Sequence, residues 1–316
     1  MRKLNAIAPV FLAAFLASCA TAPRLPAPAP DADVTLPPVL SALPAGGTVY
    51  LWADTVTSRP LLDVLTFRGV SGADMAMILD RTASVAAVVF EQGEERSFFL
   101  TAAGRYPRRR ANFALAFSRG WQRQRGEGRR TYWYSRNGDF AMSLGRRVAL
   151  VSDRDPFESL PRAVPPQAFA QFQQGMALAG WVDNPSEPIS GFLTVMGVPI
   201  MIPAEDLFFG AVRTPISPQA EANAALWDIA LRLRTPSQAH ARSLFALFST
   251  ARFFILQGAG AGEVMEEGSL SLHEAAQLLF ANVPEVDGEF LTFRITSLDE
   301  NRIALLFHIF SVYSSH

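Results

Sequence analysis

The 316-residue sequence predicts an α+β fold of two tandem duplicated lobes, each with an antiparallel sheet covered by helices. Three observations lead to this prediction. A thirteen-residue match recurs within the chain, short β-branched and aromatic runs alternate with helical patterns, and 49% of the residues are hydrophobic while 18% are charged. Such a composition provides a core for each lobe and excludes a disordered chain.

The internal repeat defines the two lobes. The thirteen residues from Ser58 match those from Ser186 at six positions, with a constant offset of 128. Trp52 matches Trp181 at an offset of 129. Two shorter matches follow in the same order (113–115 with 245–247, 147–150 with 302–305). The offsets only grow along the chain, as expected if the second copy carries insertions.

The first copy predicts the element order β-α-β-β-α-β-β. A strand at 48–53 precedes Ser58, which lies where the N-cap of a helix belongs. A second helical pattern covers 71–81, a further helix is expected at 108–119, and Asn137-Gly138 is a hairpin turn signal. The remaining strands of this copy are expected at 85–90, 97–102, 131–135, 139–144 and 147–152.

The second copy predicts the same order of elements. Its helices are expected at 189–195 and 237–248. Its strands are expected at 177–182, 207–212, 226–233, 289–296 and 302–312. A linker rich in proline and glutamine, 153–174, separates the folded lobes, which we place at 46–152 and 175–316.

The first eighteen residues are typical of a secretory signal peptide. Arg2 and Lys3 precede an apolar stretch over 6–17, which is shorter than the roughly 20 residues that a membrane-spanning helix needs. The stretch ends in Leu16-Ala17-Ser18-Cys19, which resembles the lipobox of bacterial lipoproteins. This resemblance implies cleavage before Cys19 and acylation of that residue. The alternative is an ordinary signal peptide with an incidental cysteine.

Residues 19–45 form the expected anchor and tether. Cys19 is the only cysteine of the chain, and seven prolines lie between Ala20 and Ala45. Proline-rich segments favour extended polyproline II, with about 3.1 Å per residue, over a packed core. Two or three acyl chains anchor a protein stably in a membrane. By analogy with the sorting rule of enteric bacteria, Ala20 permits export to the outer membrane, so we expect the protein on its periplasmic face or its surface.

Charge is distributed unevenly, although the formal net charge is only −1. Between Arg96 and Arg147 there are thirteen arginines and two acidic residues, whereas from Asp155 onward there are seventeen acidic residues and eight arginines. The first lobe is therefore basic and the second acidic. The near-zero total and the expected export argue against nucleic acid as a partner.

The helix expected at 108–119 is the first candidate for contact with lipid. We expect its apolar side to carry Phe113, Leu115 and Phe117. The arginines that flank this side are Arg108, Arg109, Arg110 and Arg119. Such a helix is suited to lie on an anionic bilayer, with guanidinium groups on phosphates and aromatic rings at the acyl boundary. A solvated helix face and docking on an acidic partner are the two alternatives.

Two apolar windows are the next candidates. The window 243–257, which contains Phe245 and Phe248, is apolar around most of a helix, so it must be buried or touch lipid. The uncharged window 189–204 fits a buried helix and strand or an apolar wall for a lipid. The helix expected at 272–282 follows a glycine-rich hinge and has no counterpart in the first copy.

Catalytic, metal and cofactor sites are not expected. The sequence contains no Gly-x-Ser-x-Gly and no His-Glu-x-x-His motif, and its four histidines lack metal-ligand spacing. The carboxylate pairs Glu94-Glu95 and Glu266-Glu267 lie beside glycine in expected turns, where solvation is the default. We therefore expect a protein that is not an enzyme.

The layout of anchor, tether and helix-decorated α+β lobes resembles the treponemal outer-membrane lipoproteins that associate with the membrane through amphipathic helices. The resemblance rests on Cys19 and on the expected helices (71–81, 108–119, 237–248, 272–282). It implies membrane perturbation or lipid carriage without catalysis. The leading hypothesis is thus a lipid-anchored envelope protein that contacts lipid or the membrane surface. The alternative is a tethered scaffold that binds another envelope protein through its basic and acidic lobes.

Overall fold

The chain divides into two compact units, Met1–Gln174 and Gly175–His316. The structure, a computed structural model, describes residues 38–64, 76, 79–92, 95–158, 166–187, 189–190, 201–214, 226–257, 277–278, 281–300 and 302–303. The expected signal peptide, Cys19 and most of the tether lie outside these residues. So do most of the helices expected at 71–81 and 272–282.

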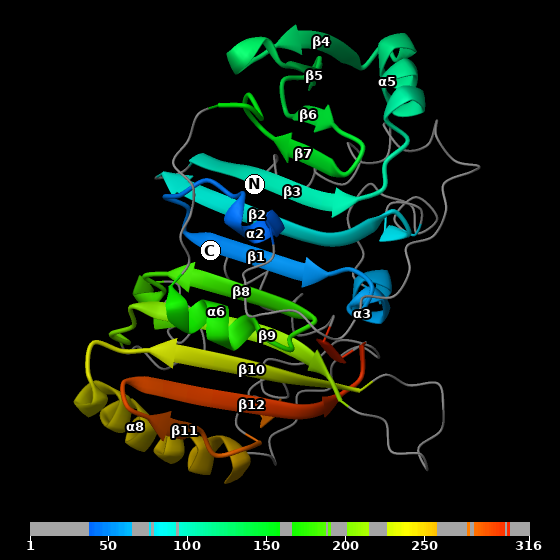
Figure 1. The fold of residues 1–316 in the computed structure, drawn as a ribbon. Helices are drawn as coiled ribbons and strands as arrows, with labels where there is room; N and C mark the ends of the chain where they lie inside the picture. The colour runs from blue at the N-terminus through cyan, green and yellow to red at the C-terminus, as the bar shows by residue number, and fades with distance from the viewer. Residues whose placement is uncertain are drawn as a thin grey trace, which may run out of the picture. The chain divides into compact units, whose positions relative to one another are not determined.

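Unit 1 is an antiparallel sheet with helices beside it (Figure 1). The strand order within the unit is β1-β2-β3-β7-β6-β5-β4. The strands are β1 (Val49–Asp54), β2 (Thr82–Gln92), β3 (Glu95–Gly104), β4 (Trp121–Arg125), β5 (Thr131–Ser135), β6 (Ala141–Leu144) and β7 (Val148–Ser152). The helices are α2 (Pro38–Ser41), α3 (Arg59–Val64), α5 (Arg108–Phe117), the 3-10 turn η2 (Glu127–Arg129) and α6 (Gln167–Gln173).

The turn between β1 and α3 forms as its sequence suggests, but with a different capping residue. Ser58 Oγ donates to the carbonyl of Asp54 over 2.5 Å and does not cap the helix. The side chain of Asp54 accepts instead, from Val56 N–H over 2.9 Å and from Thr57 N–H over 3.0 Å. Aspartate competes well for such local backbone donors, so it nucleates the turn that leads into α3.

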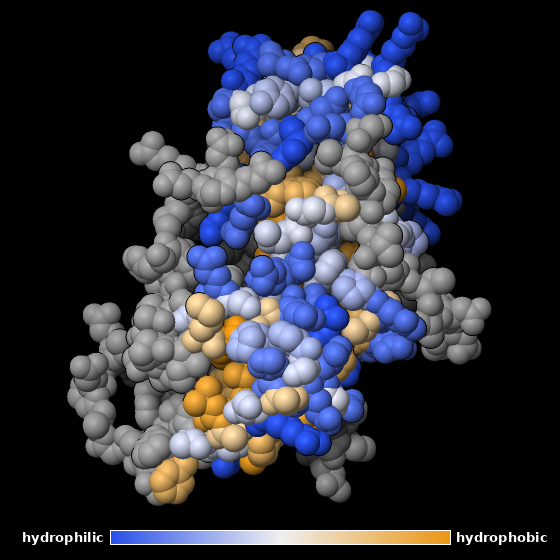
Figure 2. All heavy atoms as spheres, turned by 90° about the vertical axis from the view of Figure 1, so that its left-hand side faces the viewer, coloured by the Kyte–Doolittle hydropathy of each residue, from blue (hydrophilic) through white to orange (hydrophobic). Residues whose placement is uncertain are grey.

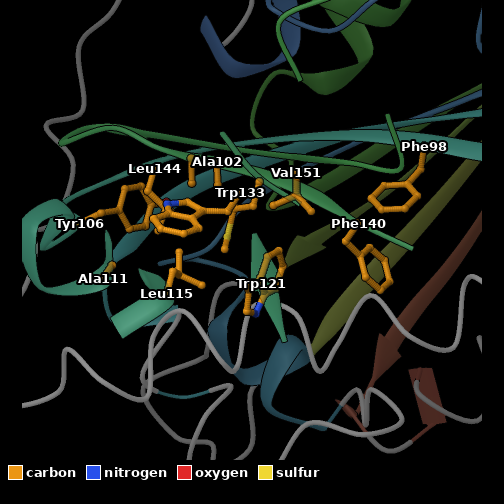
Figure 3. Packing of buried hydrophobic residues seen from close by; sticks show 12 residues of the cluster. Phe98, Ala102, Tyr106, Ala111, Leu115, Trp121, Trp133, Phe140, Leu144 and Val151 are labelled. Carbon is orange, nitrogen blue, oxygen red and sulfur yellow. The ribbon is translucent and has the colours of Figure 1, made fainter. Parts of the chain in front are cut away.

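The core of unit 1 lies between α5 and the β3-β7-β6-β5-β4 part of the sheet. Ala111 and Leu115 of α5 are 3% and 0% exposed and pack into a cluster with Trp121, Trp133 and Leu144. Figure 3 shows Tyr106, Trp133 and Leu144 gathered above Leu115 in this cluster. Trp133 Nε1 also donates to Asn112 Oδ1 over 2.7 Å, which ties the middle of α5 to β5.

Strand β4 is absent from the expected element order of unit 1. Its sequence, Trp121-Gln-Arg-Gln-Arg125, has one buried side chain, Trp121, and the rest are exposed or half-buried. A polar edge strand of this kind resists unwanted pairing with another chain, but it lacks the apolar alternation by which strands are recognised in a sequence.

Unit 2 is an antiparallel sheet in the order β8-β9-β10-β12-β11, with α8 packed on β11 and β12 (Figure 1). The elements are β8 (Leu178–Asp183), β9 (Asp206–Arg213), β10 (Trp227–Arg234), α8 (Gln238–Gln257), β11 (Glu285–Asp287) and β12 (Phe290–Leu298). Residues 189–190, where a helix was expected to begin, are helical. None of the helices within the described ranges has the length and apolarity to cross a membrane.

The two units share a strand course. In each, three successive antiparallel strands are followed by a helix, and a later strand returns to pair with the third, so β7 beside β3 corresponds to β12 beside β10. The α+β class predicted from the sequence is confirmed. The strand expected at 302–312 is wrong at its start, because Arg302 and Ile303 are helical and their N–H groups bond to the side chain and carbonyl of Asp299.

Candidate functional site

Helix α5 turns its aromatic side chains away from the core. Phe113 and Phe117 are 67% and 76% exposed, whereas Leu115 is fully buried. Successive residues of a helix are about 100° apart, so Leu115 cannot share a face with Phe113 and Phe117. The expected apolar side is therefore corrected: Leu115 belongs to the core and the two phenylalanines form the outward face.

The two exposed rings contact each other. Their centroids are 4.6 Å apart with an interplanar angle of 48°, the arrangement that residues four apart on a helix allow. Full burial of a phenylalanine side chain is worth about 1.5–3 kcal/mol, so transfer of these two exposed rings out of water would be favourable. Paired exposed aromatic rings on one helix mark a contact surface more than scattered apolar residues do.

Three arginines form the start of the same helix. Arg108, Arg109 and Arg110 occupy its first turn, are exposed, and are joined by no acidic residue in that turn. Pro107 at the N-cap makes no side-chain cap hydrogen bond. The N-terminus of a helix carries partial positive charge, so a cation there costs about 0.3–1 kcal/mol where an anion would be stabilising. This end of α5 therefore favours an external anion.

The basic charge of this region is largely uncompensated. Within the described part of the chain, Arg108, Arg109 and Arg119 form no ion pair, whereas Arg96 pairs with Glu91 over 2.8 Å. The arginine-rich end of unit 1, where β4 and β5 lie, presents a largely hydrophilic surface at the top of Figure 2. Unpaired cations of one sign on one side of a domain attract anionic ligands and surfaces.

Two concavities lie beside α5. The first, which we call the arginine pocket, has a volume of about 790 Å³ and is lined by five arginines: Arg105, Arg108, Arg109, Arg110 and Arg146. The second, the aromatic groove, has a volume of about 600 Å³. Its lining combines aromatic and apolar residues (Phe113, Ala116, Trp121, Trp133, Leu144) with polar ones (Arg108, Arg109, Asn112, Arg123, Thr131, Ser143). The two share Arg108, Arg109 and Asn112, so they are neighbours.

Tyr106 holds the base of the arginine pocket. Its ring is buried, its hydroxyl lies 3.2 Å from Thr82 Oγ1, and its N–H donates to the carbonyl of Arg146 over 3.0 Å. Burial raises the pKa of the Tyr106 phenol to about 12, while the hydrogen bond with Thr82 lowers it. The phenol is therefore neutral at physiological pH and adds no negative charge to compete with a ligand.

Arg105, Arg146 and the two tryptophans of the groove, Trp121 and Trp133, were not among the expected site residues. Their signal lies in the strand pairing: Arg105 follows β3, Arg146 precedes β7, and antiparallel pairing of β3 with β7 brings the end of one beside the start of the other. A hairpin-like register drawn between 97–102 and 147–152 would have placed both arginines next to the expected helix.

The second set of expected lipid-contact residues is corrected by the structure. Phe248 is 8% exposed and packs edge-to-face on Phe293 with ring centroids 5.1 Å apart, and Phe245 is half-buried against the same cluster. Both residues therefore belong to the core of unit 2, because α8 turns this side toward β11 and β12. In the window 189–204, Ile202 is buried and Met201 is 83% exposed, and 191–200 lie outside the described residues.

Metal-binding geometry is not found among the described residues. No three His, Cys, Asp or Glu side chains gather there as a metal site would require. The most buried carboxylate, Asp206, accepts from Trp181 Nε1 over 2.7 Å and pairs with Arg234, so it serves the packing of unit 2. That the protein is not an enzyme stays a prediction.

Comparison with known proteins finds a family of envelope lipoproteins that is similar to part of this chain. Residues 42–156, which include the sheet and α5 of unit 1, match the family described as outer membrane-associated lipoprotein TP0453. The match confirms the predicted localisation at the outer membrane and supports a lipoprotein. No curated protein matches the chain.

Solved structures of TP0453 resemble the fold of the whole chain. Crystal form III has 18% sequence identity and a TM-score of 0.53, and the match covers 90% of this chain and 100% of that one. Form I gives 17% identity and a TM-score of 0.53 over 86% and 97%, and form IV gives 18% and 0.52 over 85% and 95%. At such identities the likeness shows the fold alone.

Proposed function

We propose that this chain is a non-enzymatic, lipid-anchored protein of the outer membrane that contacts lipid through the outward face of α5. The observation that carries the proposal is the pair of exposed, touching rings of Phe113 and Phe117 on a helix that begins with three arginines. Apolar rings beside cations suit the boundary between headgroups and acyl chains of an anionic bilayer.

The acyl anchor on Cys19 and the outward face of α5 have separate roles. Acyl chains on Cys19 keep the protein at the membrane, and the proline-rich tether lets unit 1 reach the surface. The tether is shorter than expected, because α2 and Leu43 already belong to the folded unit. Phe113 and Phe117 then enter the acyl boundary, while Arg108, Arg109, Arg110 and Arg119 meet phosphate groups. Because Ala111 and Leu115 remain in the core, α5 binds without leaving its domain.

We also infer that the two units arose by duplication. The repeat of Ser58–Val70 in Ser186–Val198 supports this inference, as does the shared strand course. Among the described residues, the pair of exposed touching rings and the first turn of three arginines both lie on α5 of the first copy, so the contact function is assigned to unit 1.

Vesicle flotation tests the proposal. The predicted mature chain, residues 19–316 with Cys19→Ser, should float with vesicles that contain phosphatidylglycerol and not with phosphatidylcholine vesicles. The double variant Phe113→Ser, Phe117→Ser should lower the partition coefficient at least about tenfold, because two rings no longer transfer out of water. Phe253→Ser is the matched control, since Phe253 is a 56% exposed phenylalanine on α8. Equal flotation of the double variant and the parent chain would refute the proposal.

The scaffold hypothesis gives the opposite outcome of the same test. If the opposed charges of the units bind another envelope protein, the mature chain should fail to float with either vesicle. A partner protein should then co-purify, and Arg119→Glu should release it. The uncompensated charge of unit 1 is compatible with this alternative, whereas exposed touching rings favour lipid.

A further inference from the structure

The arginine pocket has the composition of a site for a phosphate group. Arg105 comes from the end of β3, Arg108 to Arg110 from the first turn of α5, and Arg146 from the turn before β7. Guanidinium groups donate paired N–H bonds to phosphate oxygens and keep their charge at any physiological pH. Three separate segments of unit 1 thus direct cations at one concavity.

The fold holds these cations together. Gly104 N–H donates to the carbonyl of Arg147 over 2.8 Å, and Tyr106 N–H donates to the carbonyl of Arg146 over 3.0 Å. These bonds extend the pairing of β3 with β7 to the floor of the pocket, where the Tyr106 ring is buried. Like charges held close repel one another, and a bound anion relieves that repulsion.

The aromatic groove extends the pocket and presents one exposed apolar side chain, the ring of Phe113. Trp121, Trp133 and Leu144 form its buried floor, and polar side chains (Asn112, Arg123, Thr131, Ser143) complete its lining together with Arg108 and Arg109, which it shares with the pocket. A ligand that fills both volumes therefore places an anionic group among the arginines and an apolar part against Phe113. Five arginines match the larger charge of a phosphate monoester better than the single charge of a diester.

We propose that unit 1 binds one phospholipid molecule with a terminal phosphate monoester, its phosphate in the arginine pocket and the start of its acyl chains in the aromatic groove. The proposal rests on the proposed function for the choice of a lipid as the source of the phosphate. It goes beyond that function because it requires a one-to-one complex that forms without any bilayer.

Isothermal titration with lipids below their micelle concentration tests this complex. The mature chain with Cys19→Ser should bind dihexanoyl phosphatidic acid with one-to-one stoichiometry. Its affinity for dihexanoyl phosphatidylcholine and for inorganic phosphate should be at least about tenfold lower, because each lacks either the monoester or the apolar part. Equal affinity for inorganic phosphate would show a phosphate site only and overturn the lipid assignment.

Variants locate the phosphate. The double variant Arg105→Ala, Arg146→Ala should weaken phosphatidic acid binding at least about tenfold, and the lysine pair at the same positions should weaken it less, because the charge remains without the bidentate fork. Arg136→Ala, an exposed arginine outside the pocket, is the control. Unchanged affinity of a folded double variant, checked by circular dichroism, would overturn the proposal.

Phe117→Ser separates this proposal from the proposed function. Phe117 belongs to the outward face and lines neither concavity, so its loss should weaken flotation and leave the titration unchanged. If phosphatidic acid binds and no variant affects flotation, the pocket stands and the membrane-contact function fails. If flotation depends on Phe117 and phosphatidic acid gives no heat of binding, the pocket fails alone.

Discussion

Helices α5 and α8 occupy the same place in the strand course of their units, yet they use their phenylalanines in opposite ways. The sequence Phe-Ala-Leu occurs in both, at Phe113 and at Phe245. In α5 the ring of Phe113 faces outward, whereas the described part of α8 packs Phe245 and Phe248 against its sheet. Equal motifs on corresponding helices therefore do not imply equal roles, because the phase of the helix relative to the sheet decides which residues are buried.

Unit 2 and the surroundings of α5 also differ in whether their arginines form ion pairs. In unit 2, Arg232, Arg234, Arg294 and Arg302 form ion pairs with nearby carboxylates. Around α5 the arginines line a pocket and a groove instead. The contrast is confined to the surroundings of α5, because Arg59, Arg96 and Arg154 of unit 1 also pair with carboxylates. It is the pattern expected if the α5 region binds anions.

The largest expected effect tests the burial of Phe248. Phe248→Ala should lower the free energy of unfolding of unit 2 by about 3–5 kcal/mol, because it leaves a cavity beside Phe293. Phe117→Ala should change the stability of unit 1 by less than about 0.5 kcal/mol, as for other exposed positions. Urea denaturation followed by circular dichroism measures both. Similar losses for the two variants would erase the contrast between the helices.

The second largest expected effect is a pH dependence of stability that is specific to unit 1. The pKa of Tyr106 is raised to about 12 in the folded protein, so the folded state retains a proton that the unfolded state loses. Stability should therefore be unaffected below pH 10 and fall as the pH rises from about 10 to about 12, by up to roughly 2.7 kcal/mol. Tyr106→Phe should remove this part of the fall. Thermal unfolding across that range measures it, and a Phe variant with an unchanged pH profile would contradict the assignment.

Asn112 gives a moderate effect confined to unit 1. Asn112→Ala removes the acceptor of the Trp133 indole N–H, a 2.7 Å bond in a mostly buried position, and should cost about 1–3 kcal/mol. Asn112→Asp retains an acceptor and serves as the control. Stability is measured by urea denaturation. A loss confined to the unfolding of unit 2 is the result that this structure does not allow.

The smallest effect has opposite signs for stability and for binding. Arg109→Glu replaces a cation by an anion in the first turn of α5, so it should stabilise unit 1 by about 0.3–1 kcal/mol. The same change should weaken flotation with anionic vesicles. Parallel thermal unfolding and flotation measure the two, and a variant that loses both stability and binding would show that Arg109 is structural.

Part of this architecture follows from the sequence alone. The α+β class and the order of elements from β8 to α8 follow from alternation and helical periodicity. Strand β4 escapes such reasoning because four of its five side chains are polar, and β11 because it has three residues.

The candidate site could be predicted only in composition. Arginines beside aromatic residues at 108–119 indicate an amphipathic helix, but the helical phase that buries Leu115 and exposes Phe113 depends on where the sheet lies. The same holds for Phe248, whose burial depends on Phe293 from a strand 45 positions away. Arg105 and Arg146 become neighbours only through the pairing of β3 with β7.

Hydrogen bonds hold helix α5 at three points. Just before the helix, Tyr106 N–H donates to the carbonyl of Arg146, and in its middle Asn112 Oδ1 accepts from Trp133 Nε1. At its end, Ser118 N–H donates to the carbonyl of Leu115. Since nothing in this helix has to become ordered on arrival, little conformational entropy is lost at the encounter. Its arginines should then govern how fast the protein reaches an anionic surface, and this association rate should fall with added salt. The residence time should depend mainly on the two phenyl rings and change little with ionic strength.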